Sequence, residues 1–441
     1  MPAKTLAIIG GGAAGLAAAV AAGECARQLG EELSVEVLER DDRVGRSILA
    51  TGNGRCNFSN DDLRLELYRN GRFVEDVLWS LALSCARFGD ERYKAMLRDN
   101  GDDVHAFFYK HGLLWHTEAE GRQYPFTNRA TTVLDVLRAA ADAVGVRERC
   151  DSEVRSIDLP DGKRARFTLR MADGSLRRAD AVIIACGGKG LASLGTAGMH
   201  VRPMEAVLGP LRVSDADIPF VRALDGVRVR CSVSLEREDC DGNLKTIAVE
   251  HGELMFRKYG VSGIAVFNLS RHAQPGDKLC IDLLNERNEQ DAIAFLYKRR
   301  KLLSGLAGGR PTYETVLRGI VLPRVYEELL KRAGIAPGDS FGKEDVAGLA
   351  ELLRSLRFTI AGIGDEAICQ VRRGGIPVNA IDARTMGLAG TEGLYAAGEA
   401  VDVDGPCGGY NLHWAWASGI LAGQSAVEIM FGKDDALRSF L

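Results

Sequence analysis

The chain has 441 residues. It contains 56 Lys and Arg and 60 Asp and Glu residues, which gives a net charge of 56 − 60 = −4. This balance lacks the electrostatic signature of a dedicated nucleic-acid or anionic-membrane binder. Hydrophobic residues at 46% and charged residues at 26% exclude a disordered chain, and the length predicts two or three domains or one large core with insertions.

Glycine is the unusual component, with 51 of 441 residues against a usual share of roughly 7%. No Gly-X-Y period accompanies it, which excludes collagen. We therefore expect many positive-φ turns or many close approaches of backbone segments.

Two uncharged stretches, residues 6–23 and 405–427, have the length of membrane segments. The first has Gly10, Gly11 and Gly12 at its centre, and the second contains proline, asparagine and several glycines. Neither composition suits a spanning helix or a signal peptide, so we expect no membrane segment and a cytoplasmic location. The ten cysteines include no C-x-x-C pair, and no metal-ligand spacing is present.

The N-terminus reads as a βαβ unit. Residues 5–9 are a short apolar run that ends in glycine, residues 13–28 are alanine-rich, and residues 33–39 are a second strand-like run. This order opens a doubly wound parallel sheet. We expect a helical excursion at about residues 61–130 and another buried strand at residues 181–185.

The pattern of apolar and polar residues changes further along the chain. Residues 199–285 alternate with period two, which predicts an antiparallel sheet or small barrel, and residues 286–356 return to helical periodicity. Apolar runs that are separated by glycines, as at the N-terminus, return at residues 357–441. We predict an α/β protein with a Rossmann-like nucleotide-binding domain in two parts, 1–198 and 357–441, around a β-barrel-like and a helical insertion.

The first chemical motif is G-x-G-x-x-G at residues 10–15, between a strand and a helix. Gly10 allows the tight turn, Gly12 lets the backbone approach a pyrophosphate, and Gly15 allows close helix–strand packing. Glu39 ends the next strand and suits the adenosine ribose hydroxyls. Arg40 and Arg46 are candidates to neutralise the diphosphate.

Two glycine-rich loops follow. The sequence TGNGRCN at residues 51–57 cannot be a helix or strand interior, and its amides and asparagines suit a polar ring, although a plain Ω-loop is the alternative. Cys186, Gly187 and Gly188 directly follow the strand at 181–185. Open α/β sheets bind ligands at this carboxyl edge.

The fourth motif, residues 393–419, is the most informative. A strand ends at Gly398 and Glu399, and a Gly-Gly turn opens a long helix near Gly409. Glu399 suits ribityl hydroxyls, and the helix N-terminus suits the negative charge that a flavin gains on reduction. We expect Trp414 and Trp416 in the core.

A second dinucleotide fingerprint would indicate a separate NAD(P) domain. The candidate at residues 362–367 places Asp365 and Glu366 where phosphates would bind, and like charge forbids this. We therefore expect no dedicated NAD(P)-binding domain.

With these motifs the sequence resembles the BaiN/YhiN family of flavoproteins, described as NAD(P)/FAD-dependent or aminoacetone-oxidase-like oxidoreductases. Matching segments run from the N-terminal fingerprint through residues 50–57, 121–125 and 251–263 to residues 393–423. The resemblance implies non-covalent FAD in a two-dinucleotide-binding-type fold. The residues expected to contact FAD are Gly10, Gly12, Ala13, Ala14, Gly15, Glu39, Arg40, Arg46, Thr51, Gly52, Asn53, Asn57, Val154, Gly187, Gly398, Glu399, Gly409, Tyr410, Asn411 and Leu412.

Some positions depart from the family pattern. Arg372 and Arg373 replace less charged residues, and His413 stands where the family usually has glutamine. The arginine pair indicates an anionic substrate. Arg372, Tyr410 and His413 are candidates for substrate contact, no catalytic acid or base is assigned, and Cys56 and Cys407 are expected to be inert.

The leading hypothesis is an FAD-dependent oxidoreductase that transfers hydride at flavin N5 to a small organic substrate. The family suggests reduction of an activated C=C or C=O, of the steroid enone type, with NAD(P)H as a transient reductant. An amine or aminoketone oxidase that uses dioxygen is one alternative. A flavin-dependent RNA-modifying enzyme and a non-catalytic FAD-binding protein are the others, although net charge and the lack of a basic, aromatic stripe disfavour a nucleic-acid partner.

Overall fold

The computed structural model describes residues 3–88, 102–160, 166–195, 198–285, 287–307 and 309–433. The chain divides into two compact units, Met1–Glu205 with Val371–Leu441, and Ala206–Gln370. Each unit has its own hydrophobic core. Part of the expected helical excursion, residues 89–101, lies outside the described residues.

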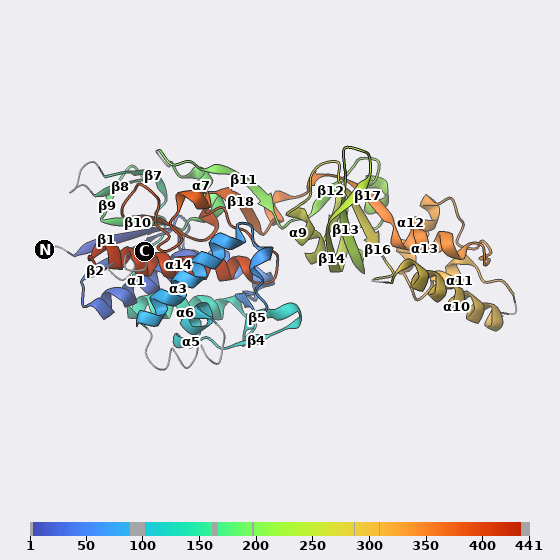
Figure 1. Cartoon of the computed structure of the whole chain (residues 1–441), viewed down its shortest axis with the longest axis horizontal. Coiled ribbons are helices and arrows are strands. Elements are labelled where there is room, and N and C mark those ends of the chain that lie inside the picture. Colours follow the sequence, from blue (N-terminus) through green and yellow to red (C-terminus); the bar gives the residue numbers. More distant parts are fainter. Residues whose placement is uncertain are drawn as a thin grey trace. The chain divides into compact units, whose positions relative to one another are not determined.

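A five-stranded parallel sheet forms the centre of the first unit, in the order β19-β10-β1-β2-β6 (Figure 1). Its strands are β1 (Lys4–Ile9), β2 (Leu33–Leu38), β6 (Arg147–Arg149), β10 (Ala181–Ile184) and β19 (Leu394–Ala396). The central strands β1 and β10 are apolar and largely buried, as a sheet covered on both faces requires. The expected α/β class with a Rossmann-like opening is confirmed.

Helices α1 (Ala13–Leu29) and α14 (Tyr410–Met430) pack with their backbones in close approach. A Cβ on Gly419 would collide with the carbonyl oxygen of Ala14, and one on Gly423 with that of Ala18. Trp414 and Trp416 are buried in the same core, as expected. The other helices of this unit are α2 (Arg46–Ala50), α3 (Gly71–Phe88), α5 (Asp103–Lys110), α6 (Ala130–Ala143) and α7 (Gly187–Ser193).

Three small sheets complete the first unit. The excursion expected to be helical also contains β4 and β5, which form a sheet with β3 just before it; local periodicity does not reveal such pairing between distant segments. The pairings are β3-β5-β4, β7-β8-β9 and β11-β18. The strands are β3 (Ser59–Asn60), β4 (Trp115–Thr117), β5 (Arg122–Pro125), β7 (Val154–Asp158), β8 (Phe167–Met171), β9 (Leu176–Ala179), β11 (Arg202–Val207) and β18 (Val371–Gly375).

The second unit contains a closed barrel and a group of helices. The barrel order is β12-β15-β14-β13-β16-β17, and alternating residues of β13 point into its core. The strands are β12 (Leu211–Val213), β13 (Arg228–Glu238), β14 (Leu244–Arg257), β15 (Gly260–Ser262), β16 (Lys278–Asp282) and β17 (Leu356–Ile363). The helices are α8 (Ile218–Ala223), α9 (Ile264–Ser270), α10 (Glu289–Ala307), α11 (Tyr313–Leu317), α12 (Pro323–Arg332) and α13 (Val346–Arg354).

The boundaries of the insertion differ from those expected. From the sequence pattern, we expect the first part of the nucleotide-binding domain to end at residue 198 and the second to begin at residue 357. In the structure, the first unit instead ends at Glu205 and resumes at Val371. The reason is β17, whose alternating burial closes the barrel between β12 and β16. Its composition resembles that of a sheet strand of the first unit, so only its pairing partners reveal its place.

None of the helices in the described part of the chain combines the length and the hydropathy needed to cross a membrane.

The contact between α1 and α14 predicts a stability effect. Gly419→Ala should lower the free energy of unfolding by about 1–3 kcal/mol, because its methyl group overlaps the Ala14 carbonyl oxygen. Gly348→Ala is the matched control, since Gly348 is helical and exposed, and nothing described lies within 4 Å of an added Cβ. That control should change stability by at most about 1 kcal/mol, in the stabilising direction. Urea unfolding of both variants would measure this, and equal midpoints would contradict it.

Candidate functional site

The loop between β1 and α1 brings three glycines to the carboxyl edge of the sheet. A Cβ on Gly10 would lie 2.6 Å from the carbonyl oxygen of Ala185, and one on Gly15 would collide with the carbonyl oxygen of Gly10. The nearest described neighbour of a Cβ on Gly12 is the Ser47 hydroxyl, at 3.0 Å. Gly10 and Gly15 therefore serve packing against backbone atoms, whereas a Cβ on Gly12 would press on the Ser47 side chain.

The N-terminus of α1 follows this loop directly. Gly12 is its N-cap residue, Ala13 and Ala14 form its first turn, and no side chain of the described residues caps it. The N–H groups of a helix start, together with the positive end of the helix dipole, suit an anionic diphosphate.

Glu39 lies directly beyond β2. Its carboxylate accepts hydrogen bonds from the N–H of Gly11 at 2.7 Å and of Asp41 at 2.9 Å. The N–H of Ser152 donates to the carbonyl of Glu39 at 2.7 Å, which brings the segment that leads into Val154 to the same place. This arrangement fits the expected role of Glu39 beside an adenosine ribose.

The expected diphosphate arginines are exposed. Arg40 and Arg46 each lie 3.9 Å from the carboxylate of Asp41. Both are therefore partly neutralised at the protein surface, and the helix start of α1 is the better-placed positive group.

The loop at residues 51–57 is a short 3-10 turn with left-handed residues. Gly52 and Asn53 have φ values of 56° and 55° and are exposed, and the Thr51 hydroxyl donates to the carbonyl of Ile48 at 2.7 Å. The Asn57 side chain accepts from the N–H of Gln123 at 3.1 Å. Asn57 therefore shapes the loop, while Gly52 and Asn53 present polar backbone outward.

Glu399 lies at the second half of the candidate site. Its carboxylate accepts from the N–H of Arg372 at 2.6 Å. Burial raises the pKa of Glu399 to about 7, against the opposing effect of this hydrogen bond. A ligand hydroxyl that donates to this carboxylate would replace lost water. Ribityl hydroxyls supply such donors.

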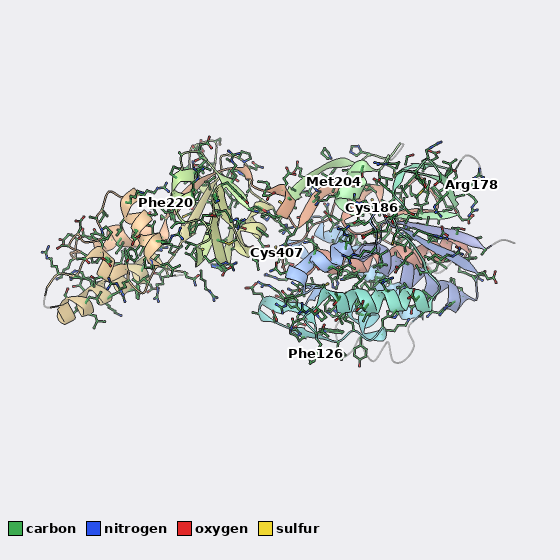
Figure 2. The ribbon with its side chains drawn as sticks, turned by 180° about the vertical axis from the view of Figure 1, so that it is seen from behind. Phe126, Arg178, Cys186, Met204, Phe220 and Cys407 are labelled. Atoms are coloured by element: carbon green, nitrogen blue, oxygen red, sulfur yellow. The ribbon has the colours of Figure 1, made fainter. Side chains whose placement is uncertain are left out.

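Several glycines keep the backbone close around Glu399. A Cβ on Gly188 would lie 3.0 Å from the Glu399 carboxylate and 2.5 Å from the methyl group of Met204, and one on Gly187 would lie 3.7 Å from the same carboxylate. Figure 2 labels Met204 and Cys186 in this part of the molecule. The N–H of Gly398 donates to the Ser418 hydroxyl at 2.9 Å, which ties the Glu399 turn to α14. The sequence motifs do not single out Met204, because it comes from β11, outside every glycine-rich segment.

The start of α14 is held by its own loop. Gly409 has a φ of 101°, and a Cβ there would collide with the carbonyl oxygen of Ser59. The Asn411 side chain accepts from the N–H of Gly405 and donates to its carbonyl, both at 2.9 Å. Leu412 is half-buried on the first turn. This terminus is therefore rigid and suits a partial negative charge.

Two of the three expected substrate contacts are buried and engaged. The hydroxyl of Tyr410 donates to the carbonyl of Asp62 at 3.0 Å, and Tyr410 is buried. His413 is 1% exposed, and its Nδ1 lies 2.9 Å from the Ser59 hydroxyl oxygen. Both side chains are buried and bonded within the protein, and their contact with a substrate stays a prediction. Arg372 alone is half-buried beside Glu399.

His413 belongs to a buried charged network. Nε2 of His413 lies 3.9 Å from Asp102, and Nδ1 of His105 lies 2.8 Å from the same carboxylate. Burial lowers the pKa of His413 to about 4, although Asp102 opposes this. Burial by itself would raise the pKa of Asp102, but the two histidines outweigh this effect and lower that pKa to about 2. The His105 pKa is raised, since its bond to Asp102 outweighs burial.

The remaining candidates supply no chemistry of their own. Cys56 is buried, and burial raises the pKa of its thiol to about 12, which makes it inert as expected. The described residues contain no cluster of metal ligands. The rejected sequence at residues 362–367 lies in the second unit, where Asp365 accepts from the N–H of Ala367 at 2.9 Å. FAD fits the first unit, with Gly12 and α1 suited to its diphosphate, Glu39 to its adenosine ribose, and Glu399 and α14 to its ribityl and ring.

The chain is similar to known proteins along nearly its whole length. The sequence profile of the HI0933-like protein Rossmann domain matches residues 4–425. A 3-dehydro-bile acid delta(4,6)-reductase of Clostridium scindens is 33% identical, over 96% of this chain and 98% of the relative. A ribosomal RNA dihydrouridine synthase of Haemophilus influenzae is 28% identical, over 93% and 95%. A solved 3-ketosteroid-delta4-(5alpha)-dehydrogenase of Rhodococcus jostii is 15% identical, over 96% and 97%, with a TM-score of 0.44.

The contrast between Gly12 and Gly15 predicts the effect of two alanine substitutions. Gly12→Ala should lower FAD affinity at least about tenfold, since a methyl group intrudes on the diphosphate, while the stability of the apoprotein changes by about 1 kcal/mol or less. Gly15→Ala should destabilise the apoprotein by about 1–3 kcal/mol, since its methyl group overlaps the Gly10 carbonyl oxygen. Flavin fluorescence titration and thermal unfolding would measure both effects. Unchanged FAD affinity in Gly12→Ala would contradict this placement.

The buried histidine predicts a pH effect on stability. The pKa of His413 is about 4 in the folded protein and about 6.5 when unfolded. As pH falls through this window, the unfolded chain binds a proton that the folded protein does not, so stability decreases. His413→Gln should remove up to about 3 kcal/mol of this loss. The free energy of unfolding, measured at several pH values between these two, would show this effect, with His200→Gln at an exposed histidine as the control. Parallel plots of stability against pH for His413→Gln and the wild type would contradict it.

Proposed function

Since the chain belongs to the HI0933-like Rossmann family, the flavoprotein family that its motifs resemble, we propose that this FAD-dependent oxidoreductase reduces a conjugated C=C bond of a small organic substrate with NAD(P)H. The observation that carries the proposal is the full-length similarity to a bile acid reductase. In this reaction NAD(P)H supplies a hydride to the β carbon of an enone and solvent supplies a proton to the α carbon. NAD(P)⁺ and the saturated ketone are the products.

When bound, FAD supplies hydride transfer through N5. The chain's own residues would bind and orient it: the N-terminus of α1 would hold the diphosphate, and the Glu399 carboxylate would accept from the ribityl hydroxyls. The N–H groups of the first turn of α14 would stabilise negative charge at the ring. The hydrogen bonds that Tyr410 makes to the Asp62 carbonyl and that His413 shares with the buried Ser59 hydroxyl hold this turn in place.

The absence of a second fingerprint among the described residues supports transient rather than resident NAD(P)H. The nicotinamide would then enter the site, leave as NAD(P)⁺, and be replaced by the substrate. Such exchange requires a ring that both molecules can reach from solvent, so the nicotinamide and the small substrate would use the same approach in turn.

A second candidate has the same chemistry on a different substrate. Dihydrouridine is uridine with a reduced C5=C6 bond, and this bond is conjugated to a carbonyl, as in an enone. The similarity to ribosomal RNA dihydrouridine synthases favours this candidate. The net charge of −4 disfavours tight RNA binding.

Anaerobic stopped-flow mixing tests the proposal. NADH or NADPH should bleach the flavin absorbance, and a steroid enone should restore it faster than dioxygen does. Bleaching by neither nicotinamide would overturn the reductase. Rapid reoxidation by dioxygen alone, after bleaching by an amine, would support the oxidase instead. Dihydrouridine formed in an unmodified ribosomal RNA transcript would select the second candidate.

A further inference from the structure

The short strand β3 joins the two segments that suit a flavin ring. The loop at residues 51–57 leads directly into it, and the start of α14 packs against it. The carbonyl of Phe58 accepts from the indole N–H of Trp416 at 2.9 Å, and the side chain of Asn60 donates to the carbonyl of Gly408 at 2.8 Å. The loop and the start of α14 therefore share one support.

Strand β5 holds β3 from its other side. The N–H of Phe58 donates to the carbonyl of Gln123 at 3.0 Å, and the N–H of Gln123 donates to the side chain of Asn57 at 3.1 Å. The Gln123 side chain is buried, and its oxygen lies 2.5 Å from Nε2 of His105. Gln123 belongs to the motif at residues 121–125, to which the sequence assigns no role. It links the end of the loop to α5.

Two buried histidines meet at one carboxylate beneath this support. Nδ1 of His105 lies 2.8 Å from Asp102, and Nε2 of His413 lies 3.9 Å from it. The two histidines are 3% and 1% exposed. Because Nε2 of His105 faces an amide oxygen and Nδ1 faces a carboxylate, a proton on both nitrogens suits this ring, in agreement with its raised pKa. His105 is then the cation that balances Asp102.

His413 connects the carboxylate back to β3. Its Nδ1 lies 2.9 Å from the hydroxyl oxygen of Ser59, which is fully buried. Burial lowers the pKa of His413 to about 4, so near neutral pH the ring donates through one nitrogen and accepts through the other. A glutamine amide can also donate and accept, whereas a leucine side chain can do neither. We call these four side chains the histidine network: His413, Asp102, His105 and Gln123.

The network acts on the helix end that faces the flavin ring in the proposed placement of FAD. His413 lies on the first turn of α14, and the preceding Gly409 is pressed against the carbonyl of Ser59. The electrostatic effect of a helix end decays within one turn, so it depends on where that turn is held. Reduced FAD carries more negative charge at its ring than oxidised FAD, and a displaced turn would therefore weaken the binding of the reduced form more.

We propose that the histidine network positions the loop at residues 51–57 and the first turn of α14 as one rigid piece, and thereby raises the reduction potential of bound FAD. The inference rests on the placement of FAD in the first unit and is independent of the substrate that is reduced. The role requires no contact between these four side chains and the substrate.

The first test compares His413→Leu and His413→Gln in the FAD-loaded protein. In His413→Leu, reduced FAD should lose about tenfold more affinity than oxidised FAD, since the helix end is no longer held in place. For a two-electron couple this is a fall of about 30 mV in midpoint potential. His413→Gln should keep the potential of the wild type, because the amide restores both hydrogen bonds. Spectroscopic titration against a reference dye measures the potential without turnover.

The second test uses hydrogen exchange in the apoprotein. His413→Leu should speed the exchange of amide protons in residues 51–57 and in residues 408–413 together, because both segments lose the same support. His413→Gln should leave both segments as slow as in the wild type. Mass spectrometry of peptides from the two segments measures this without FAD.

His111→Leu is the matched control. His111 caps the other end of α5, is half-buried, and lies 3.7 Å from Glu24, outside the network. This variant should leave the potential and the exchange of both segments unchanged. Where His413→Leu fails to fold, Ser59→Ala carries the same expectations, because it removes only the hydroxyl that bonds to His413.

Three outcomes would overturn the inference: an unchanged potential in His413→Leu or its substitute Ser59→Ala, faster exchange in α14 without the loop, or a His413→Gln protein that behaves like His413→Leu. None of these measurements involves NAD(P)H or an enone. Failure of the proposed reductase in stopped-flow mixing would therefore leave them untouched, and their failure would leave the reductase standing.

Discussion

The backbone contact between α1 and α14 is the constraint on which the rest of the structure depends. Gly419 and Gly423 lie against the carbonyls of Ala14 and Ala18, so two helices about four hundred residues apart in sequence share one register. The N-terminus of α1 suits a diphosphate, and that of α14 suits a flavin ring. Because the helices cannot slide, the distance between these two anion-attracting ends is set by packing rather than by a ligand.

Charge is distributed unevenly around this frame. Asp404, Asp402 and Asp102 all have cationic or histidine partners within 4 Å. Glu399 differs, because its carboxylate has a backbone donor and a pKa raised to about 7 by burial. A buried carboxylate without full compensation is costly to the apoprotein. Hydroxyl donors would lower this cost, so the pKa of Glu399 is consistent with a site that takes a hydroxyl-bearing ligand.

The glycine-rich motifs can be interpreted from local sequence, because each requires the close backbone approach that glycine alone allows. Gly10 and Gly15 behave in this way, as the overlap of any added Cβ shows. The side chains that follow these motifs cannot be interpreted so directly. His413 and Tyr410 stand next to the Gly-Gly turn in sequence, yet the helix rotates both into the core. Arg373 is a cation available to a ligand in the sequence, whereas in the fold Asp404 lies beside it and cancels its charge.

The sequence by itself determined the α/β class, the βαβ opening, the family and the loops that suit FAD, because these depend on local patterns of apolar, glycine and acidic residues. Only the tertiary structure decided where the barrel ends, that β17 belongs to it, and that Arg69 and Arg202 share Asp402. Strand pairing and ion pairs join residues far apart in the chain. Their energies depend on distance and burial, which a linear pattern does not contain.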